Sequence, residues 1–403
     1  MQKKIIALAV AGLVSGGVFA QSNVTISGGI FMGYDSNKTT GTAAAAGFGT
    51  VNRVTDHSSN LNINGTEDLG GGMKAVFQID TRFGLDQAGS PWSGGNSHVG
   101  LTGNWGAVRM GKQDLHYSEL AGGIGAMRVR SLQSLLGHGI MSEVNGVAIT
   151  PRTRATNVAW YTSPTMSGFT AQLAASTNPY GAEGAQTADG SKGSAWNLTA
   201  KYANGPINAG YSYWQNNEEG GNGAAGGAGT AAANCTAAIA AGAGATAAQV
   251  NACLGAIAGF TPTASDQRSN RIWGRYTMSN GLALGLGYDS SKYDNDATAN
   301  TNWVKRNAWQ ATGQYTMGAN AFYLQYAKAG NTSGAGAADT SSGARAWLLG
   351  YDYALSKRTN VGVSYTEVKN DTTNGTYDFF ASTTATGVGM KSSQWHLGMS
   401  HSF

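Results

Sequence analysis

Short runs in which apolar and polar side chains alternate recur along most of this chain. Residues 282–289 read LALGLGYD, with a large apolar residue at every second position, and in residues 309–317, WQATGQYTM, Gln and Thr occupy every second position. Successive side chains of a β-strand point to opposite faces, so each run gives a strand one apolar and one polar or small face. A strand that crosses a membrane shows this pattern over about 10 residues. The chain is therefore predicted to be all-β.

The same alternation returns often enough to fill a large sheet. Further runs that mostly end in an aromatic residue lie at 196–202, 207–213, 322–326, 347–353 and 361–365. An aromatic ring at the end of such a run suits the lipid headgroup region, where one neighbour is apolar and the other is wet. Counting runs from 24–34 to 394–403 gives about sixteen strands, enough for an antiparallel barrel with an aqueous passage.

Short and long connections alternate between the runs, as in membrane barrels. The short ones include 204–206, 279–281 and 357–359. The long ones fall near 39–55, 113–151, 178–193, 216–266, 290–302, 330–343 and 370–391. The connection 216–266 is nearly all Ala, Gly, Thr and Asn, and we expect Cys235 and Cys253 to clip it with a disulfide. A metal or redox role is disfavoured because no CxxC pair or neighbouring histidine is present.

The N-terminus has the features of a secretory signal. Lys3 and Lys4 precede an apolar run over 5–14, and small residues lead to Ala20. The run is about 10 residues long, whereas a spanning helix needs about 20. We therefore predict a signal peptide over 1–20 and a single transmembrane barrel domain over 21–403.

Composition excludes several other classes of protein. Charged residues make up only 12% of the chain, and the net charge of +4 falls to +2 without Lys3 and Lys4, so no nucleic-acid partner is expected. After the signal, no apolar stretch is long enough for a membrane helix, which leaves a closed barrel as the spanning structure. The chain has no Walker-type loop, HExxH motif or complete GxSxG elbow, and its six histidines are scattered. We expect no enzyme activity, no cofactor and no metal.

The alternation also assigns charged residues to the lumen. If Ile272 and Tyr276 face lipid, Arg271 and Arg275 face the lumen. Placing an arginine at the lipid midplane costs about 2–4 kcal/mol, which favours this assignment. The same alternation of faces along the strand places Asp80 and Arg82 on the lumen side.

Three segments resemble the trimeric general porins of β-proteobacterial outer membranes. The strongest match, GTEDLGGGMKAVFQ at 65–78, looks like that family's second periplasmic turn and third strand, and VGLTGNWG at 99–106 and NVAWYTSP at 157–164 support it. The resemblance extends over essentially the whole mature chain. It implies a homotrimer in the Gram-negative cell outer membrane, in contact with lipid and lipopolysaccharide, that forms a water-filled channel for passive diffusion of small hydrophilic solutes and ions. The barrel-assembly machinery would read the terminal strand, whose signal would include Trp395 and Phe403.

The resemblance further implies a loop after Gln113 that folds into the barrel and narrows it. Charged candidates on this loop and its flanks are Arg109, Lys112, Asp114, Glu119, Arg128, Arg130 and Arg154. Together with Asp80, Arg82, Arg271 and Arg275 they would line the constriction. The excess of positive charge predicts a preference for anions. Asn60 and Asn64 stand where the family usually has basic residues, which thins the expected row of arginines.

Two other functions remain open at this point. A solute-specific channel of the same architecture would place aromatic residues such as Trp160 and Trp214 along a sugar or amino-acid path. An adhesin or phage-receptor barrel would act through its external loops and have a closed lumen. Block of conductance by a solute identifies the former, and loop-dependent binding without conductance identifies the latter.

Overall fold

The structure is a computed structural model that describes residues 23–41, 50–86, 93–116, 127–131, 139–144, 147–149, 154–179, 194–217, 266–294, 303–334, 341–372, 377 and 389–403. The predicted signal peptide, Glu119, Cys235 and Cys253 lie outside these residues. Within the described part of the chain, no helix is long and apolar enough to cross a membrane.

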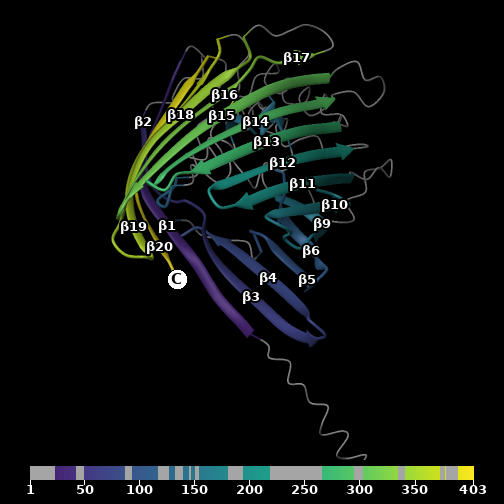
Figure 1. The fold of residues 1–403 in the computed structure, drawn as a ribbon. Coiled ribbons are helices and arrows are strands. Elements are labelled where there is room, and N and C mark those ends of the chain that lie inside the picture. The colour runs from purple at the N-terminus through teal and green to yellow at the C-terminus, as the bar shows by residue number, and fades with distance from the viewer. Residues whose placement is uncertain are drawn as a thin grey trace, which may run out of the picture.

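Antiparallel strands form one large sheet that curves around into a barrel (Figure 1). Its sixteen wall strands are β1 (Asn23–Thr40), β3 (Ser59–Gly70), β4 (Met73–Phe83), β5 (Ser97–Gly103), β6 (Gly106–Asp114), β9 (Arg154–Thr162), β10 (Phe169–Ser176), β11 (Ser194–Asn204), β12 (Ile207–Asn217), β13 (Asp266–Thr277), β14 (Leu282–Asp294), β15 (Trp303–Met317), β16 (Asn320–Ala329), β18 (Ala344–Ala354), β19 (Thr359–Asn370) and β20 (Lys391–Ser402). The prediction of an antiparallel barrel of about sixteen strands is confirmed.

Four shorter strands complete the set. β2 (Thr50–Asp56) pairs with the upper part of β1, and β17 (Ser333–Gly334) pairs with β15. β7 (Glu143–Val144) and β8 (Val147–Ala148) form a separate two-stranded hairpin. This hairpin belongs to the connection between β6 and β9, which proves to be the functionally important one.

The first and last strands close the barrel. β1 and β20 pair continuously from Gly29 opposite Ser402 to Thr40 opposite Lys391, and the two labels lie side by side in Figure 1. Gly28 and Phe403 extend the pairing with two backbone hydrogen bonds, N to O, of 3.1 and 3.2 Å. Closure removes both sheet edges, so every wall strand has a hydrogen-bonded neighbour on each side.

One interruption in the wall lies next to this seam. β1 pairs with β3 through residues 23–29 and with β2 through residues 32–38, so β2 and β3 act as one strand broken at His57 and Ser58. Ser58 has a φ of 74°, in the left-handed region that a serine seldom adopts. The His57 N–H donates to the Phe31 carbonyl oxygen at 2.8 Å, and the break leaves the His57 side chain buried.

The two faces of the wall are reversed relative to a soluble protein. Leu286 and Ile272 are 66% and 59% exposed on the outer face, whereas their neighbours Asp289 and Arg271 are 0% and 2% exposed inside. Arg271 and Asp80, which the alternation places inside, are both buried. An exposed apolar outside and a polar inside are what a lipid solvent requires of a barrel.

Aromatic rings gather at both ends of the outer face. Rings on neighbouring strands pair at Trp196–Tyr213, Trp309–Tyr326 and Trp347–Tyr365 toward the long connections, with centroids 4.8, 5.2 and 5.0 Å apart. Toward the short turns, Phe169–Tyr202 and Phe322–Tyr351 pair at 4.6 and 5.1 Å. The two bands match the predicted aromatic girdles at the headgroup levels.

The connections separate by length, with all short turns at one end of the barrel and all long connections at the other. The short turns lie at 71–72, 104–105, 163–168, 205–206, 278–281, 318–319 and 355–358. The 84–96 connection between β4 and β5 is an additional long one that the sequence pattern did not separate from its strands. The turn at 71–72 is the first short turn in the described chain rather than the second, because β2 and β3 act as one strand.

Deletion of Phe403 is expected to impair assembly of the barrel. The deletion removes both backbone hydrogen bonds to Gly28 and the ring that fills the space where Gly28 has no side chain. The amount of heat-modifiable protein in the outer-membrane fraction, measured by gel electrophoresis, should fall severalfold. The exposed neighbour Ser402→Ala serves as control. Equal amounts of folded protein in both variants would contradict an assembly role for Phe403.

Candidate functional site

The connection between β6 and β9 (the lumen loop) is described at 115–116, 127–131, 139–144 and 147–149, and these parts lie inside the barrel. Its described parts contact several strands of the wall: residues 127–131 reach β18, β20 and β1, and residues 139–144 reach β14 and β15. The inward-folded loop expected from the resemblance is therefore confirmed. Because such a loop crosses the passage, its attachment to the wall sets the width of the opening.

A buried carboxylate on β18 holds the middle of the lumen loop. Asp352 Oδ2 accepts the backbone N–H groups of Arg128 and Val129 at 2.6 and 3.2 Å, and Asp352 is fully buried. Beside it, Ser131 Oγ donates to Gln394 Oε1 of β20 at 2.6 Å. Hydrogen bonds to an ionised acceptor are roughly twice as strong as neutral ones. Asp352 is therefore the main anchor of this segment.

A second anchor is an ion pair between two wall strands. Arg306 Nη1 lies 3.0 Å from Asp289 Oδ1, and both side chains are fully buried. The same guanidinium donates through Nη2 to the backbone carbonyls of Met141 and Glu143 in the lumen loop. Asp289 also faces Arg271, whose Nε is 3.8 Å from Oδ2. One carboxylate thus balances two wall arginines, and one of these holds the loop.

His116, at the start of the lumen loop, is the third anchor. Its ring hydrogen-bonds to Ser212 Oγ at 2.8 Å and Ser269 Oγ at 2.7 Å on β12 and β13. Burial and the nearby Arg271 cation hold the pKa of His116 well below its usual range. The imidazole is therefore neutral at pH 7, with one nitrogen as donor and the other as acceptor.

Apolar side chains of the lumen loop pack on two patches of the inner wall. Met127, Ile140 and Met141 cluster with residues of β15, β16 and β18. Leu115, Val144 and Ile149 cluster with a second group that contains Trp160 and Trp214. These two tryptophans are only 4% and 0% exposed. They lie beneath the loop, so the interpretation in which they line an open solute path is wrong.

The predicted basic residues near β4, β6 and β9 gather on one side of the lumen, and two of them are paired with acids. Arg82 Nη2 lies 2.8 Å from Asp80, and Arg154 Nε lies 3.3 Å from Asp114. Lys112 Nζ donates to the Ser93 carbonyl oxygen at 3.2 Å. The predicted acids Asp80 and Asp114 therefore lie beside Arg82 and Arg154 and neutralise them.

Four predicted cations form no ion pair in the described part of the chain: Arg109, Lys112, Arg128 and Arg130. Arg130 lies over the Phe31 ring, 4.5 Å from its centroid, which provides cation–π stabilisation. Burial and the repulsive Arg82 cation lower the pKa of Arg130. The lumen loop and the wall beside it thus carry cations without an ion pair, and of these Arg128 lies near the Asp352 carboxylate.

The remaining predicted residues lie apart from this group. Arg271 is turned inward but buried in the Asp289 cluster, so it does not border open water as predicted. Arg275 donates to Thr277 Oγ1 at 3.0 Å, toward the short turns. Trp395 lies on the outer face of β20 and is 58% exposed. Only part of the predicted set therefore meets at the loop.

Sequence reasoning missed Arg306 and Asp352, two charged wall residues that hold the lumen loop. Both could have been placed inside by parity, since Arg306 shares a face with Gln310 and Thr312. Their role was not visible, because it depends on loop segments that are far away in sequence.

The Asp352→Ala variant should release the middle of the lumen loop. It removes the acceptor of two backbone N–H groups, at a cost of about 1–3 kcal/mol for the groups left unpaired. Limited proteolysis of the folded protein should then cut within the loop faster than in the parent chain. The Asp68→Ala variant, which removes a carboxylate from the 71–72 turn, should leave the cleavage rate unchanged. Equal protection of the loop in both variants would rule out Asp352 as an anchor.

Acidification should loosen the His116 anchor. The folded-state pKa of His116 lies below the ordinary value of 6.5, so protons bind preferentially when the loop is detached. The stabilisation is complete above pH 6.5 and is lost as the pH falls below it. The thermal midpoint should therefore fall less between pH 7 and pH 5 in His116→Gln than in the parent chain. The exposed-histidine variant His401→Gln should behave like the parent, and a His116→Gln profile parallel to the parent would refute the assignment.

Comparisons with known proteins agree with this geometry. The chain is similar to an outer membrane porin protein of Bordetella pertussis, with 31% identity over 241 residues that cover 54% of this chain and 60% of that protein. It is also similar to outer membrane porin protein 32 of Delftia acidovorans, with 34% identity over 179 residues, or 42% of this chain and 48% of that protein. The alignments thus span less than two thirds of these relatives.

Solved structures share the fold over nearly the whole chain. An anion-selective porin from Comamonas acidovorans superposes with a TM-score of 0.67 at 22% identity, covering 95% of this chain and all of that one. The trimer form of OmpT from Vibrio cholerae gives a TM-score of 0.59 at 14% identity, covering 95% and 99% of the two chains. The family model described as Gram-negative porin matches residues 7–373. With its closed barrel and inward loop, the chain therefore belongs to the Gram-negative porin family, whose barrels stand in the outer membrane.

Proposed function

We propose that this protein is a diffusion pore for small hydrophilic solutes and ions, with a preference for anions. The observation that carries the proposal is the charge balance around the lumen loop. Asp80, Asp114 and Asp289 each form an ion pair with an arginine of the wall, whereas Arg109, Arg128 and Arg130 form no ion pair with a described acid. The net charge of the side chains around the lumen loop is therefore positive.

The mechanism is passive and electrostatic. The low-dielectric barrel wall focuses the field of the unbalanced cations into the water of the passage, which raises the local anion concentration. Anchoring by Asp352 and Arg306 keeps the loop at a fixed distance from the wall, and this distance sets the size limit for solutes. No bond is made or broken, so the proposal includes neither catalysis nor a cofactor. The Comamonas structure named above as anion-selective shares this fold, which supports the same sign of selectivity here.

The proposal includes processing and assembly. Residues 1–20 are a cleaved signal peptide, residues 21–403 form the mature barrel, and Cys235 and Cys253 form a disulfide in the long connection. The barrel-assembly machinery inserts the chain through its terminal strand with Trp395 and Phe403. The mature barrel is a homotrimer among outer-membrane lipid and lipopolysaccharide. The apolar outer face supports the contact with lipid, and the trimer form of the structurally similar OmpT supports the homotrimer.

Conductance in a planar lipid bilayer tests the pore. Purified protein should give stepwise openings in groups of three, and the reversal potential in a salt gradient should favour anions. If the protein conducts but the reversal potential favours cations, the anion preference is refuted and the proposal of a pore still holds. A protein that inserts but never conducts would refute the pore and favour a barrel that acts through its external loops.

Removal of the three unbalanced cations tests the source of selectivity. In water a unit charge about 10 Å away contributes about 0.4 kcal/mol before screening, so the triple variant Arg109→Gln, Arg128→Gln, Arg130→Gln should lower the anion-to-cation permeability ratio severalfold at low salt. The charge-matched control is a triple variant in which the exposed cations Lys74, Lys357 and Arg358, near the short turns, are each replaced by Gln. Equal reversal potentials of the two triple variants would exclude the three arginines from the selective region.

A further inference from the structure

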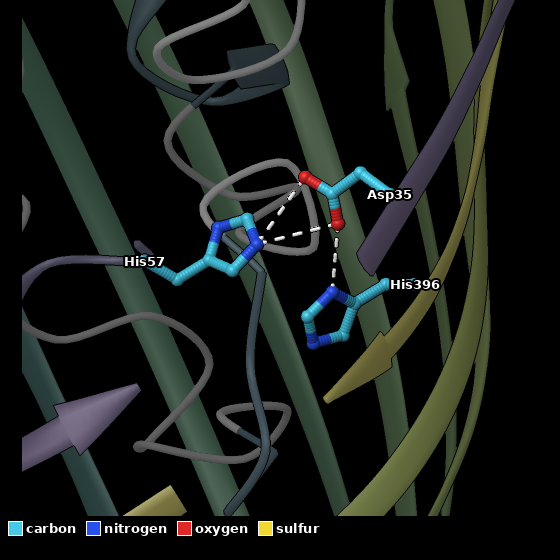
Figure 2. Close-up of side chains that lie close together, drawn as sticks. All are labelled: Asp35, His57 and His396. Atoms are coloured by element: carbon cyan, nitrogen blue, oxygen red, sulfur yellow. Dashed lines mark hydrogen bonds and ion pairs between the residues drawn. The ribbon is translucent and has the colours of Figure 1, made fainter. Parts of the chain in front are cut away.

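Two histidines and an aspartate converge at the seam of the barrel (Figure 2). Asp35 is on β1, His396 is on β20, and His57 is at the break between β2 and β3. All three side chains are buried. Asp35 Oδ1 lies 2.8 Å from His396 Nδ1, and the two carboxylate oxygens lie 3.3 and 3.2 Å from His57 Nε2. The pore mechanism makes no use of this group.

The backbone around the group is shaped to bring the rings together. Asp35 stands directly opposite His396 in the strand register, and Gly33 stands opposite Gly398. A Cβ on Gly33 would lie 2.1 Å from His396 Cε1, and one on Gly398 would lie 2.5 Å from His396 Nε2. Two facing glycines therefore leave the space that the imidazole occupies. The break in the second wall strand brings His57 to the same carboxylate, and the two imidazole centroids are 4.7 Å apart at an interplanar angle of 89°.

The three groups are the ligand set of a borderline transition-metal ion. One nitrogen from each imidazole and one carboxylate oxygen all lie within 4.8 Å of one another. Four ligands at about 2.1 Å in a tetrahedron are about 3.4 Å apart. The contacts of His57 with Asp35, at 3.2 and 3.3 Å, match that separation, and His396 is a few tenths of an ångström closer. Imidazole and carboxylate ligands together favour zinc, copper and nickel over magnesium and calcium.

One further feature suits a metal site. Arg53 Nε donates to Asp35 Oδ2 at 3.4 Å, and both carboxylate oxygens remain within 3.3 Å of His57 Nε2. Hydrogen bonds of this kind orient metal-ligating carboxylates.

We propose that Asp35, His57 and His396 form a binding site for a divalent transition-metal ion of the zinc class. The ion joins the first strand, the last strand and the break in the second wall strand, and so clamps the barrel at its closure. The scattered positions 35, 57 and 396 have no metal-binding spacing in the sequence, which is why no metal was expected from it. The site does not depend on ion selectivity or on conductance.

Retention of zinc by the folded full-length barrel tests the proposal. Because the ligands are buried, the mature chain is refolded in detergent with zinc, and free metal is then removed by gel filtration. Mass spectrometry of the metal should find about one zinc ion per chain. His57→Gln and His396→Gln should each lose at least nine tenths of it, and His98→Gln, which changes a histidine outside the group, should retain it. A parent chain without bound zinc, or the two variants with as much zinc as the parent, would overturn the proposal.

Folding of the variants is checked by heat-modifiability. If the histidine variants fail to fold, the parent chain decides the question by itself. Refolded with cobalt, it should show the intense visible absorption of a tetrahedral site, and crystals grown with zinc should show anomalous scattering among Asp35, His57 and His396. Crystals with no anomalous peak at this position would refute the site.

Discussion

Pairing of the first strand with the last is the interaction on which the rest of this structure depends. In lipid no water is available to satisfy a free strand edge, so the wall must close. β1 and β20 meet over twelve residue pairs, from Gly29–Ser402 to Thr40–Lys391, and Gly28 and Phe403 add two more backbone hydrogen bonds. This register decides which residues face each other across the seam, and it places Asp35 opposite His396.

Closure of sixteen strands leaves a lumen too wide for side chains to fill, and the lumen loop occupies part of it. The loop is held mainly by charge. Asp352 accepts two of its backbone N–H groups, and Arg306 donates to two of its carbonyls while paired with Asp289. Buried charges are costly unless they are paired and hydrogen-bonded, so these anchors constrain the loop more strictly than its apolar contacts do. Because Asp80, Asp114 and Asp289 pair with arginines of the wall, Arg128 and Arg130 of the loop form no ion pair with them.

Much of the wall was predictable because strand geometry is local. A period of two places Arg271 and Asp80 inside and Ile272 outside without any knowledge of neighbouring strands. The alternation of faces does not determine whether an inward side chain contacts water or is covered by another part of the protein. Trp160 and Trp214 point inward as the alternation requires, yet the lumen loop covers them. For the same reason the anchoring roles of Arg306 and Asp352 could not be predicted, because their partners in the lumen loop are more than 150 residues away in sequence.

The sequence by itself determined the strand pattern, the two faces of the wall, the alternation of short and long connections and the family. These follow from the hydrophobic period and from motifs within single segments. The tertiary structure alone decided which charges pair, which remain unbalanced and which histidines meet. Those outcomes depend on strand register and on the path of one loop, and both are fixed by contacts between residues tens to hundreds of positions apart.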